Sequence, residues 1–259
     1  MQKQFRTVAV IPARMGASRF PGKPLVKILD LPMIEHVRRR VSLCSCIDEV
    51  YVATCDEEIK RAVERYGGKA IMTADTHERC TDRVEEAIQD IDCDIVFIFQ
   101  GDEPLFDLSV ADKLLRPFID HSQTLCSNLI STIKNEDDLR DMNIVKAVLD
   151  RRQRVLCFSR AALPYKRVGT ACPLYRQTGL SAFKRDFLVQ FSNLAPTPLE
   201  MRESIDFMRI LEHGFAIQGV VFEQELFGVD EPRHIAIIEK ILQENPTQKA
   251  IYEEIRVHV

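Results

Sequence analysis

The stretch Val10–Leu25 reads VIPARMGASRFPGKPL, and it passes directly from an apolar strand into a charged loop. The loop carries three cationic side chains, Arg14, Arg19 and Lys23. Its glycines do not fit the GxGxxG or GxxxxGK[ST] spacings of glycine-rich phosphate loops. Cations that follow a strand nevertheless suit phosphate groups, although the same residues would also suit a solvated surface loop.

The bulk composition is that of an ordinary globular protein. The 259 residues are 46% hydrophobic and 29% charged, which fits one large α/β domain or two small ones. A net charge of -4 argues against general nucleic-acid binding, and no apolar run reaches transmembrane length, so neither nucleic acid nor membrane is expected as a partner. The eight cysteines are scattered without a CxxC pair, which predicts reduced thiols in a cytoplasmic protein.

Strand and helix signals alternate along the first half of the chain. Short apolar runs predict strands, and amphipathic runs of helical period predict helices. The expected strands are Val8–Ile11, Glu49–Thr54, Ala70–Met72 and Asp94–Phe99, and the expected helices are Leu31–Ser42, Asp56–Tyr66, Asp82–Asp90 and Val110–Phe118. We interpret the N-terminal run as a first buried strand and not as a signal peptide. Strands separated by helices predict βαβ units and a parallel sheet.

The second half of the chain has a different pattern. Alternating apolar residues predict antiparallel strands there, and two nearby prolines predict a loop. The expected antiparallel strands are Val145–Leu149, Val155–Ser159 and Thr178–Phe183. A further strand is expected at Ala216–Phe222, helices at Glu203–His213 and a closing Pro232–Leu242, and a loop at Asn193–Leu199. The economical fold is a single α/β domain over residues 1–259 with an antiparallel insertion near residues 140–185.

Ligands of open α/β sheets bind at the carboxyl ends of the strands, so the polar residues that follow each strand are the candidates. Asp102 follows the apolar run DIVFIF in the turn QGDEP, and Asp230 follows a late strand in the loop GVDEP. Two such carboxylates suit a hard cation such as Mg²⁺ that takes substrate phosphates as further ligands. Gly101 would let the backbone approach a ligand closely. Alternatively, the two carboxylates are loop residues or helix N-caps.

Five motifs, in order along the chain, resemble the 3-deoxy-manno-octulosonate (Kdo) cytidylyltransferases. They are PARMGASRFPGKPL, MTADTHERCTDR, QGDEPL, FSRAALPY and GVDEP. The resemblance covers nearly the whole chain and is looser after Leu174. It implies an α/β, Rossmann-like nucleotidyltransferase fold with a mostly parallel central sheet and an antiparallel dimerisation insertion. It also implies a homodimer that converts CTP and a 3-deoxy-2-keto sugar acid into a CMP-sugar and pyrophosphate with Mg²⁺.

The resemblance assigns roles to individual positions. Arg14 and Lys23 match triphosphate-binding positions, Asp102 and Asp230 match the two magnesium ligands, and the catalytic candidates are Arg14, Lys23 and Asp102. The nucleotide-binding candidates are Ala13, Arg14, Arg19, Lys23, Thr81, Asp82, Arg83 and Gln100, and the sugar-binding candidates are Gln100, Arg160, Gln177, Ser181 and Asp206. The transfer needs in-line positioning of the sugar's anomeric hydroxyl and neutralisation of charge more than covalent help from the protein.

The sugar-side motifs depart from the family pattern. Where the family reads RHxGIYxY, this chain has Gln177 for the histidine and Ser181 for the first tyrosine. Where the family reads LEQLR, it has Asp206 for the glutamate and Phe207 for the glutamine. Buried hydrogen-bonding groups discriminate strongly between hydroxyl patterns, so we hypothesise a sugar acid other than plain Kdo, such as an amino-substituted Kdo. The alternative is repacking without functional consequence.

Other functions compete with this interpretation. A binding or regulatory protein could have kept the fold and lost turnover, although intact Arg14, Lys23, Asp102 and Asp230 argue against it. A transferase for another nucleotide or sugar would use a similar loop. A nicotinamide-dependent dehydrogenase is disfavoured because no GxGxxG follows the first strand.

Overall fold

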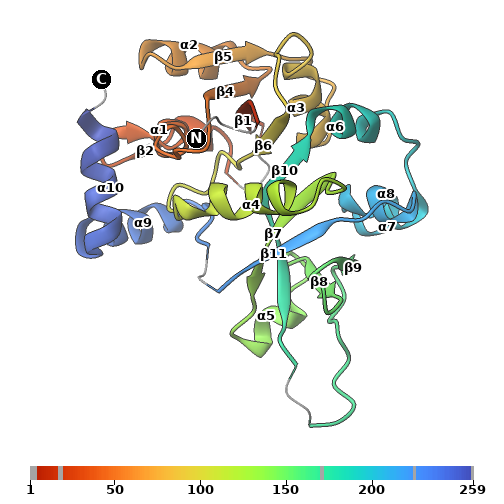
Figure 1. Ribbon diagram of the computed structural model, residues 1–259. Coiled ribbons are helices and arrows are strands. Elements are labelled where there is room, and N and C mark those ends of the chain that lie inside the picture. The colour runs from red at the N-terminus through yellow and green to blue at the C-terminus, as the bar shows by residue number, and fades with distance from the viewer. Residues whose placement is uncertain (1–4, 17–19, 170–171, 224–225, 258–259) are drawn as a thin grey trace. The chain divides into compact units, whose positions relative to one another are not determined.

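The computed structural model describes most of the chain, namely residues 5–16, 20–169, 172–223 and 226–257 (Figure 1). The chain separates into two compact units. The first unit comprises Met1–Asp112 and Leu226–Val259, and the second comprises Lys113–Glu225. The expectation of one domain over the whole chain stays a prediction.

A parallel sheet forms the centre of the first unit. Its strands lie in the order β6-β1-β4-β5, and each neighbouring pair is parallel. The strands are β1 (Thr7–Ala13), β4 (Glu49–Thr54), β5 (Lys69–Met72) and β6 (Ile95–Ile98), and the helices between them are α1 (Met33–Ser42), α2 (Glu57–Arg65) and α3 (Cys80–Ala87). Both β1 and β6 are buried along their whole length, which accounts for their unbroken apolar runs. The predicted βαβ units are confirmed.

The order in which the chain adds parallel strands to this sheet reverses between β1 and β6. From β1 the chain proceeds outward through β4 to β5, and it then returns so that β6 lies on the other side of β1. Ligands of open α/β sheets bind at such reversal points, because the loops after the two neighbouring strands leave in opposite directions. The loops after β1 and β6 carry Arg14 and Asp102. The sequence candidates of this unit therefore start from neighbouring strand ends.

The loop after β6 packs closely on the end of β1. The amide of Phe99 donates a 3.2 Å hydrogen bond to the carbonyl of Val10. A Cβ atom at Gly101 would lie 3.3 Å from the carbonyl oxygen of Pro12 and 3.4 Å from Cδ1 of Ile34. Glycine therefore suits the close approach of these two backbone segments, because any side chain here would make tight contacts.

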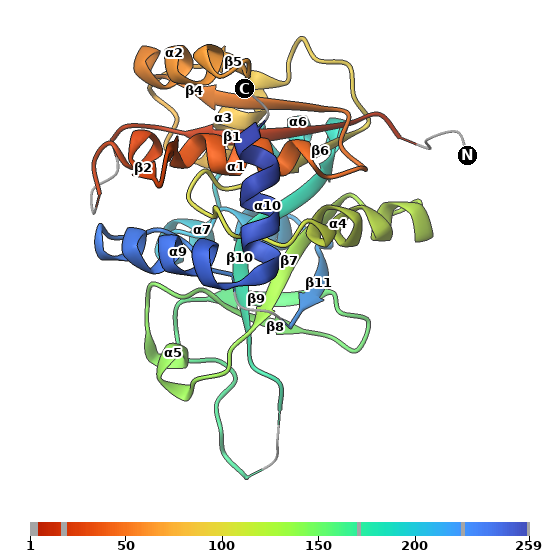
Figure 2. The same cartoon turned by 90° about the vertical axis from the view of Figure 1, so that its left-hand side faces the viewer.

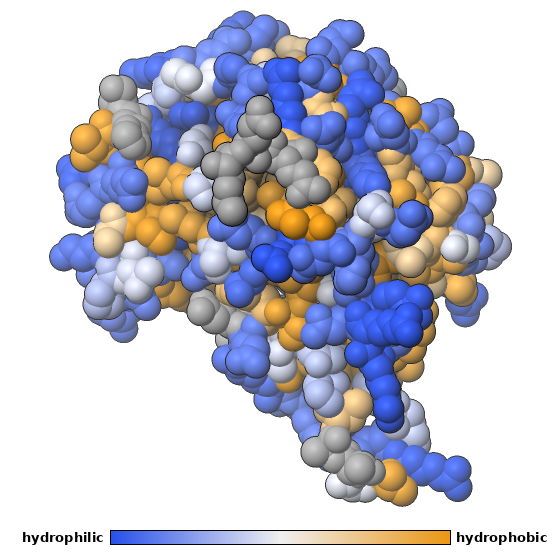
Figure 3. Space-filling model, in the orientation of Figure 1, coloured by the Kyte–Doolittle hydropathy of each residue, from blue (hydrophilic) through white to orange (hydrophobic). Residues whose placement is uncertain are grey.

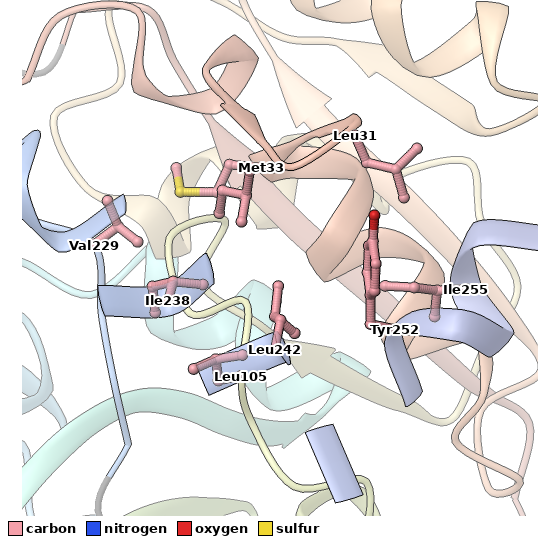
Figure 4. Close-up of a cluster of buried hydrophobic side chains, with 9 residues drawn as sticks. Leu31, Met33, Leu105, Val229, Ile238, Leu242, Tyr252 and Ile255 are labelled. Atoms are coloured by element: carbon pink, nitrogen blue, oxygen red, sulfur yellow. The ribbon is translucent and has the colours of Figure 1, made fainter. Parts of the chain in front are cut away.

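The C-terminal helix α10 (Pro246–Val257) packs beside α1 and α9 (Arg233–Glu244) in the first unit (Figure 2). Apolar side chains from these helices form one buried cluster with residues of the neighbouring loops (Figure 4). Its members are Ile28, Leu31, Met33, Leu105, Val229, Ile238, Leu242, Tyr252 and Ile255. Leu105 lies three residues after Asp102, and Val229 directly precedes Asp230. The cluster thus anchors the loops of both predicted magnesium ligands.

The second unit contains the predicted antiparallel strands. Its strand order is β11-β7-β10, with β8 beside β10 and β9 beside β8, and only the β11–β7 pair is parallel among the pairs described within this unit. The strands are β7 (Cys126–Thr132), β8 (Lys146–Leu149), β9 (Val155–Ser159), β10 (Tyr175–Lys184) and β11 (Gln218–Phe222). After β9, residues 160–169 extend away from the sheet as a loop, and the surface at this end of the molecule shows both hydrophilic and hydrophobic residues (Figures 1 and 3).

Short helices surround an aromatic core in the second unit. Phe207 packs edge-on against Phe158, Phe183 and Phe191, with ring centroids 6.2, 5.6 and 6.3 Å away, respectively. Phe183 also stacks on Phe187 at 6.5 Å. The helices of this part of the chain are α4 (Ser109–Asp120), which includes the boundary between the units, α5 (Glu136–Arg140), α6 (Arg185–Ser192), α7 (Pro198–Glu203) and α8 (Phe207–Glu212).

Two predicted helices begin at the wrong residue. Leu31 and Pro32 are not helical, because they form the short strand β3 (Leu31–Pro32) paired with β2 (Lys27–Ile28). The helix predicted from Glu203 is interrupted, because α7 ends there and Ser204 takes a left-handed φ of 53° before α8. The loop predicted to reach Leu199 ends earlier, since a capping box at Thr197 starts α7.

Several elements escaped prediction. They include β7, α5, α6 and α10, so that α9 is not the closing helix. The sequence of β7, CSNLIST, lacks an apolar alternation although almost all of it is buried. The donors of two of its polar side chains reach backbone carbonyls: Ser127 donates to Leu114 at 2.8 Å, and Asn128 donates to Thr178 at 3.1 Å. The side-chain oxygen of Asn128 is buried without a hydrogen-bond partner among the described residues. Burial of polar residues with their partners conceals such a strand from pattern analysis.

The cysteines agree with the prediction of reduced thiols, since all eight are free. Burial raises the pKa of the Cys44 thiol to about 12, which makes it unreactive. None of the helices in the described ranges has the length and apolarity needed to cross a bilayer.

Candidate active site

Lys23 joins the two carboxylate loops of the first unit. Its ammonium group forms an ion pair with the carboxylate of Asp102 and donates a 3.0 Å hydrogen bond to the carbonyl of Val229. The amide of Val229 in turn donates to the carbonyl of Asp102 at 2.8 Å. Because Asp230 follows Val229 directly, one cation and one backbone bond hold together the loops of both predicted magnesium ligands.

Helix capping does not account for these two carboxylates. The next helix after Asp102 is α4, and its first amide, that of Ser109, bonds to Asp107 at 2.8 Å. The N-cap of α9 is Pro232, and that helix has no side-chain cap. The amide of Asp230 instead donates to the ring of His234 at 3.1 Å.

The loop after β1 is closed at its base. The amide of Gly22 donates to the carbonyl of Met15 at 2.9 Å, and Gly22 has a φ of 74°, which favours glycine. The amide of Met15 donates to the carboxylate of Asp56 at 2.8 Å. Sequence reasoning missed Asp56, although its position two residues after the end of β4 was a usable signal.

The remaining candidates of this loop differ in their surroundings. Ala13 is buried at the end of β1, and Arg14, the next residue, is exposed. An exposed cation at this strand end can reach an incoming phosphate, so the geometry is compatible with the predicted role. Arg19 lies outside the described residues.

The predicted cytosine and ribose segment begins α3. Thr81 and Arg83 are buried, at 4% and 3% exposure, and Asp82 is half-buried. The guanidinium of Arg83 donates to the hydroxyl of Thr73 and, at 3.3 Å, to the carbonyl of Ala74. Arg83 therefore supports the loop between β5 and α3, and its described bonds point to a structural task.

The same loop carries an ion pair that sequence reasoning did not predict. His77 pairs with the carboxylate of Glu86, which also accepts the amide of Ala74 at 2.9 Å. Burial opposes the charged form of Glu86, but the bonds from His77 and Ala74 outweigh it, so its pKa lies below its ordinary value. At the start of α3, the thiol of Cys80 lies 3.9 Å from Oε1 of Gln100. The predicted candidate Gln100 thus meets the MTADTHERCTDR motif through Cys80, which was not itself a candidate.

The donor set at Lys23 suits a magnesium ion that is shared with a substrate. Asp102 and Asp230 offer oxygen ligands, and over the described part of the chain no three His, Cys, Asp or Glu side chains converge into a metal site. Mg²⁺ usually binds proteins through one or two carboxylates and completes its shell with water and substrate phosphates. The ammonium of Lys23 already places one positive charge between these loops. These residues therefore fit Mg²⁺.

On the sugar side, Arg160 is engaged in local structure. Its guanidinium donates to the carbonyls of Glu203 at 2.7 Å and Met142 at 2.9 Å. The carboxylate of Glu203 accepts the Arg160 amide at 2.9 Å and the Ser159 hydroxyl at 2.8 Å. The bond from that amide lowers the pKa of Glu203 below its ordinary value. Arg160 thus ties the end of β9 to the end of α7.

Gln177 and Ser181 lie on either side of an irregularity in β10. The pairing of β10 with β7 shifts register between these two residues. Gln177 is half-buried, whereas Ser181 is 2% exposed and lies opposite Asn128. Bulges of this kind re-aim side chains and are common beside functional sites. Of the four positions that depart from the family pattern, the two in β10 therefore flank the one irregular stretch described in this pairing.

Asp206 and Phe207 start α8. The carboxylate of Asp206 accepts the amide of Phe207 at 3.0 Å, so Asp206 is the N-cap of this helix. Phe207 is 5% exposed and belongs to the aromatic core. The change from the family's glutamine to Phe207 is a core-packing change.

Comparisons with known proteins match this chain to cytidylyltransferases. A family model described as cytidylyltransferase matches residues 8–226. A 3-deoxy-manno-octulosonate cytidylyltransferase of Geobacter metallireducens is 39% identical over 248 residues, covering 91% of this chain and 98% of that protein. An 8-amino-3,8-dideoxy-manno-octulosonate cytidylyltransferase of Shewanella pealeana is 41% identical over 234 residues, covering 89% and 96%.

A solved structure gives the same assignment. It is a CMP:2-keto-3-deoxy-manno-octonic acid synthetase complexed with CTP, and it matches with a TM-score of 0.88 at 35% identity, covering 92% of this chain and 99% of that one. The α/β nucleotidyltransferase fold and the enzyme class predicted from the motifs are confirmed. The chain belongs to the 3-deoxy-manno-octulosonate cytidylyltransferase family of nucleotidyltransferases.

Proposed function

We propose that this chain transfers a cytidylyl group from CTP to the anomeric hydroxyl of a 3-deoxy-2-keto sugar acid, with release of pyrophosphate and with Mg²⁺ held by Asp102 and Asp230. The observation that carries the proposal is the double contact of Lys23 with Asp102 and Val229, together with the backbone bond between those two loops. It supports a charged centre at the end of β1 and β6, where a triphosphate would enter.

The residues of this centre would act by position and charge. When bound, Mg²⁺ would lower the pKa of the attacking hydroxyl and neutralise the α-phosphate, so no protein base is needed. The carboxylates of Asp102 and Asp230 would hold it between the two loops. Lys23 and Arg14 would bind the triphosphate and offset the negative charge that develops on the departing pyrophosphate. Gln100 would orient the sugar beside the nucleotide.

The sugar would differ from plain Kdo, with an amino-substituted Kdo as the leading candidate. The departures at Gln177 and Ser181 support this, because both flank the irregular stretch of β10. The printed name of one relative, an 8-amino-3,8-dideoxy-manno-octulosonate cytidylyltransferase, adds support. Pyrophosphate release with CTP, Mg²⁺ and a panel of keto sugar acids, followed by mass spectrometry of the product, tests it. A wide preference for Kdo would refute the idea.

A homologue without turnover is the competing function, and the bonds of Arg160 favour it to the extent that they engage this predicted sugar-binding cation with backbone carbonyls. The same assay separates the two, since a binder would retain CTP without releasing pyrophosphate. Binding measurements with UTP, ATP and GTP beside CTP test the nucleotide. Free thiols support a reducing, cytoplasmic location for the chain.

We also propose a homodimer formed through the antiparallel insertion. Leu156 of β9 is 61% exposed, and Tyr165 and Val168 in the following loop are 85% and 67% exposed. Large apolar side chains at such exposure suit a protein interface. Light scattering should give twice the mass of 29.7 kDa, and Leu156→Lys should shift the protein toward monomer.

A further inference from the structure

Two side chains remote from the strand ends hold the loop that follows Asp102. Gln248 of α10 donates through Nε2 to the carbonyl of Leu105 at 3.1 Å. Arg40 of α1 donates through Nη1 to the carbonyl of Phe106 at 3.0 Å and to Oε1 of Gln248 at 2.8 Å. Two consecutive carbonyls of this loop are therefore held by one linked pair of side chains from opposite ends of the sequence.

Arg40 is an unexpected residue for a helix interior. Its side chain is fully buried, and its hydrogen-bond acceptors in the described residues are neutral oxygens. Its Nε and Nη2 atoms have no acceptor in that part of the chain, and the ring of Phe106 lies 5.9 Å from its Cζ. Burial lowers its pKa to about 10, so it is still charged at neutral pH. Asp107 acts on Arg40 only through space, and no described hydrogen bond joins the guanidinium to a carboxylate. A buried cation held in this way is a poor source of stability, which leaves positioning as its role.

Helix α10, which carries Gln248, is firmly attached to α1. Arg39 of α1 donates to the carbonyl of Ile255 at 2.7 Å, and Tyr252 stacks on His36 at 5.6 Å. The buried cluster of Figure 4 holds Leu105 and the residue before Asp230 against the same helices. The family model ends at residue 226, before this segment.

We propose that Gln248 and Arg40 are positioning residues, which keep the loop of Asp102 in register with that of Asp230 so that both carboxylates serve one cation. The inference rests on the proposed function of these carboxylates. Some residues support a metal ligand through hydrogen bonds without touching the metal. Substituting such a residue commonly changes metal affinity or activity by about 10-fold to 100-fold.

The substitution Gln248→Glu separates positioning from stability. The new carboxylate still accepts from Arg40 and gives this arginine a directly hydrogen-bonded charge partner, so the melting temperature should hold or rise. The same change removes the donor to Leu105 and places a carboxylate oxygen against that carbonyl. The Mg²⁺ concentration for half-maximal pyrophosphate release should rise about ten-fold, with the rate restored at high Mg²⁺. Deuterium exchange of the amides of residues 100–106 should become faster without any ligand.

Gln243→Glu is the matched control, because Gln243 is an exposed glutamine on α9 and takes the same change of charge. It should leave the Mg²⁺ dependence and the amide exchange as in the wild type. Gln248→Ala, which loses both bonds, should also raise the Mg²⁺ concentration for half-maximal pyrophosphate release. It replaces Gln248→Glu in this test if that variant does not fold. The inference fails if the wild type turns over CTP but Gln248→Glu keeps its Mg²⁺ dependence and its amide exchange. A wild type that releases no pyrophosphate at any Mg²⁺ concentration would instead refute the proposed function, and the exchange experiment would still test the loop.

Discussion

The nucleotide-side and sugar-side candidates differ in what their polar groups contact. In the first unit, Lys23, Asp102 and Val229 come from three loops distant in sequence and bond to one another. In the second unit, Arg160 donates to the carbonyls of Glu203 and Met142, and Asp206 accepts the amide of the next residue, so both bond to backbone atoms. Parallel strands bring their carboxyl ends to one sheet edge, so their loops converge, whereas antiparallel strands have their carboxyl ends at opposite edges. Assignments based on strand ends are therefore better supported by geometry than those based on motif position alone.

The largest effect is expected on the nucleotide side. Asp102→Asn removes the carboxylate that pairs with Lys23, and we expect pyrophosphate release to fall about 1,000-fold, equivalent to ~4 kcal/mol of transition-state stabilisation. Asp120→Asn is the control, because Asp120 is an exposed residue that pairs with Arg116 on the surface of α4, and its loss should affect stability by less than about 1 kcal/mol with normal turnover. Near-normal rates for Asp102→Asn would contradict the proposed difference between the nucleotide side and the sugar side, because the convergent loops would then not contribute to catalysis.

The next effect concerns the sugar side, where Phe207→Gln restores the residue of the family pattern. Because Phe207 packs against three other rings, burying an amide there should lower the free energy of unfolding by about 3 kcal/mol. Urea denaturation measures it. Phe227→Gln, at a phenylalanine that is 37% exposed, should cost far less. If Phe207→Gln left the free energy of unfolding unchanged, residue 207 would be assigned to sugar binding and not to core packing.

The response to acid should also separate the two units. Burial lowers the pKa of His36 from 6.5 to about 4, although the bond to the carbonyl of Ile28 opposes this. Between these values the unfolded chain binds the extra proton, so the free energy of unfolding falls as pH falls from 6.5 toward 4. At pH 5 the loss from this group should be about 2 kcal/mol relative to pH 7.5. His36→Gln should remove that part of the difference in urea denaturation.

Glu203 provides the contrast in the second unit. Its folded pKa lies below the ordinary 4.5, so its contribution to stability is present above that value and is lost only as pH falls further. Glu203→Gln should therefore leave the difference between pH 7.5 and pH 5 unchanged. If it removed as much of that difference as His36→Gln, the assignment of the acid response to His36 would be wrong.

The smallest effect tests the sugar. Gln177→His restores the family residue at a half-buried position, and we expect the ratio of kcat/KM for Kdo over amino-substituted Kdo to rise about five-fold, or ~1 kcal/mol. Steady-state kinetics with both sugars measures it. Gln153→His, at a turn before β9, is the control and should leave the ratio unaltered. A ratio that stays constant in Gln177→His would place specificity elsewhere.

The sequence by itself determined the parallel half of the fold and the nucleotide-side motifs. Apolar runs such as β1 and β6 are legible because a strand covered on both faces admits few polar residues. The positions of Lys23 and Asp102 followed from the same runs, because each lies in the loop after its strand. The boundaries of α1 were less legible, since Leu31 and Pro32 pair as a short strand through contacts outside the local pattern.

Only the tertiary structure decided which polar groups meet. No local pattern links Lys23 with Val229, or Arg40 with Gln248, because the bonds depend on loops and helices that fold together from distant parts of the chain. The sequence pattern also failed to reveal the strand β7 and the helix α10, because their side chains are buried or hydrogen-bonded by residues distant in the sequence. Periodicity reports which face of an element is buried, whereas the burial of a polar side chain depends on the partner that the fold brings to it.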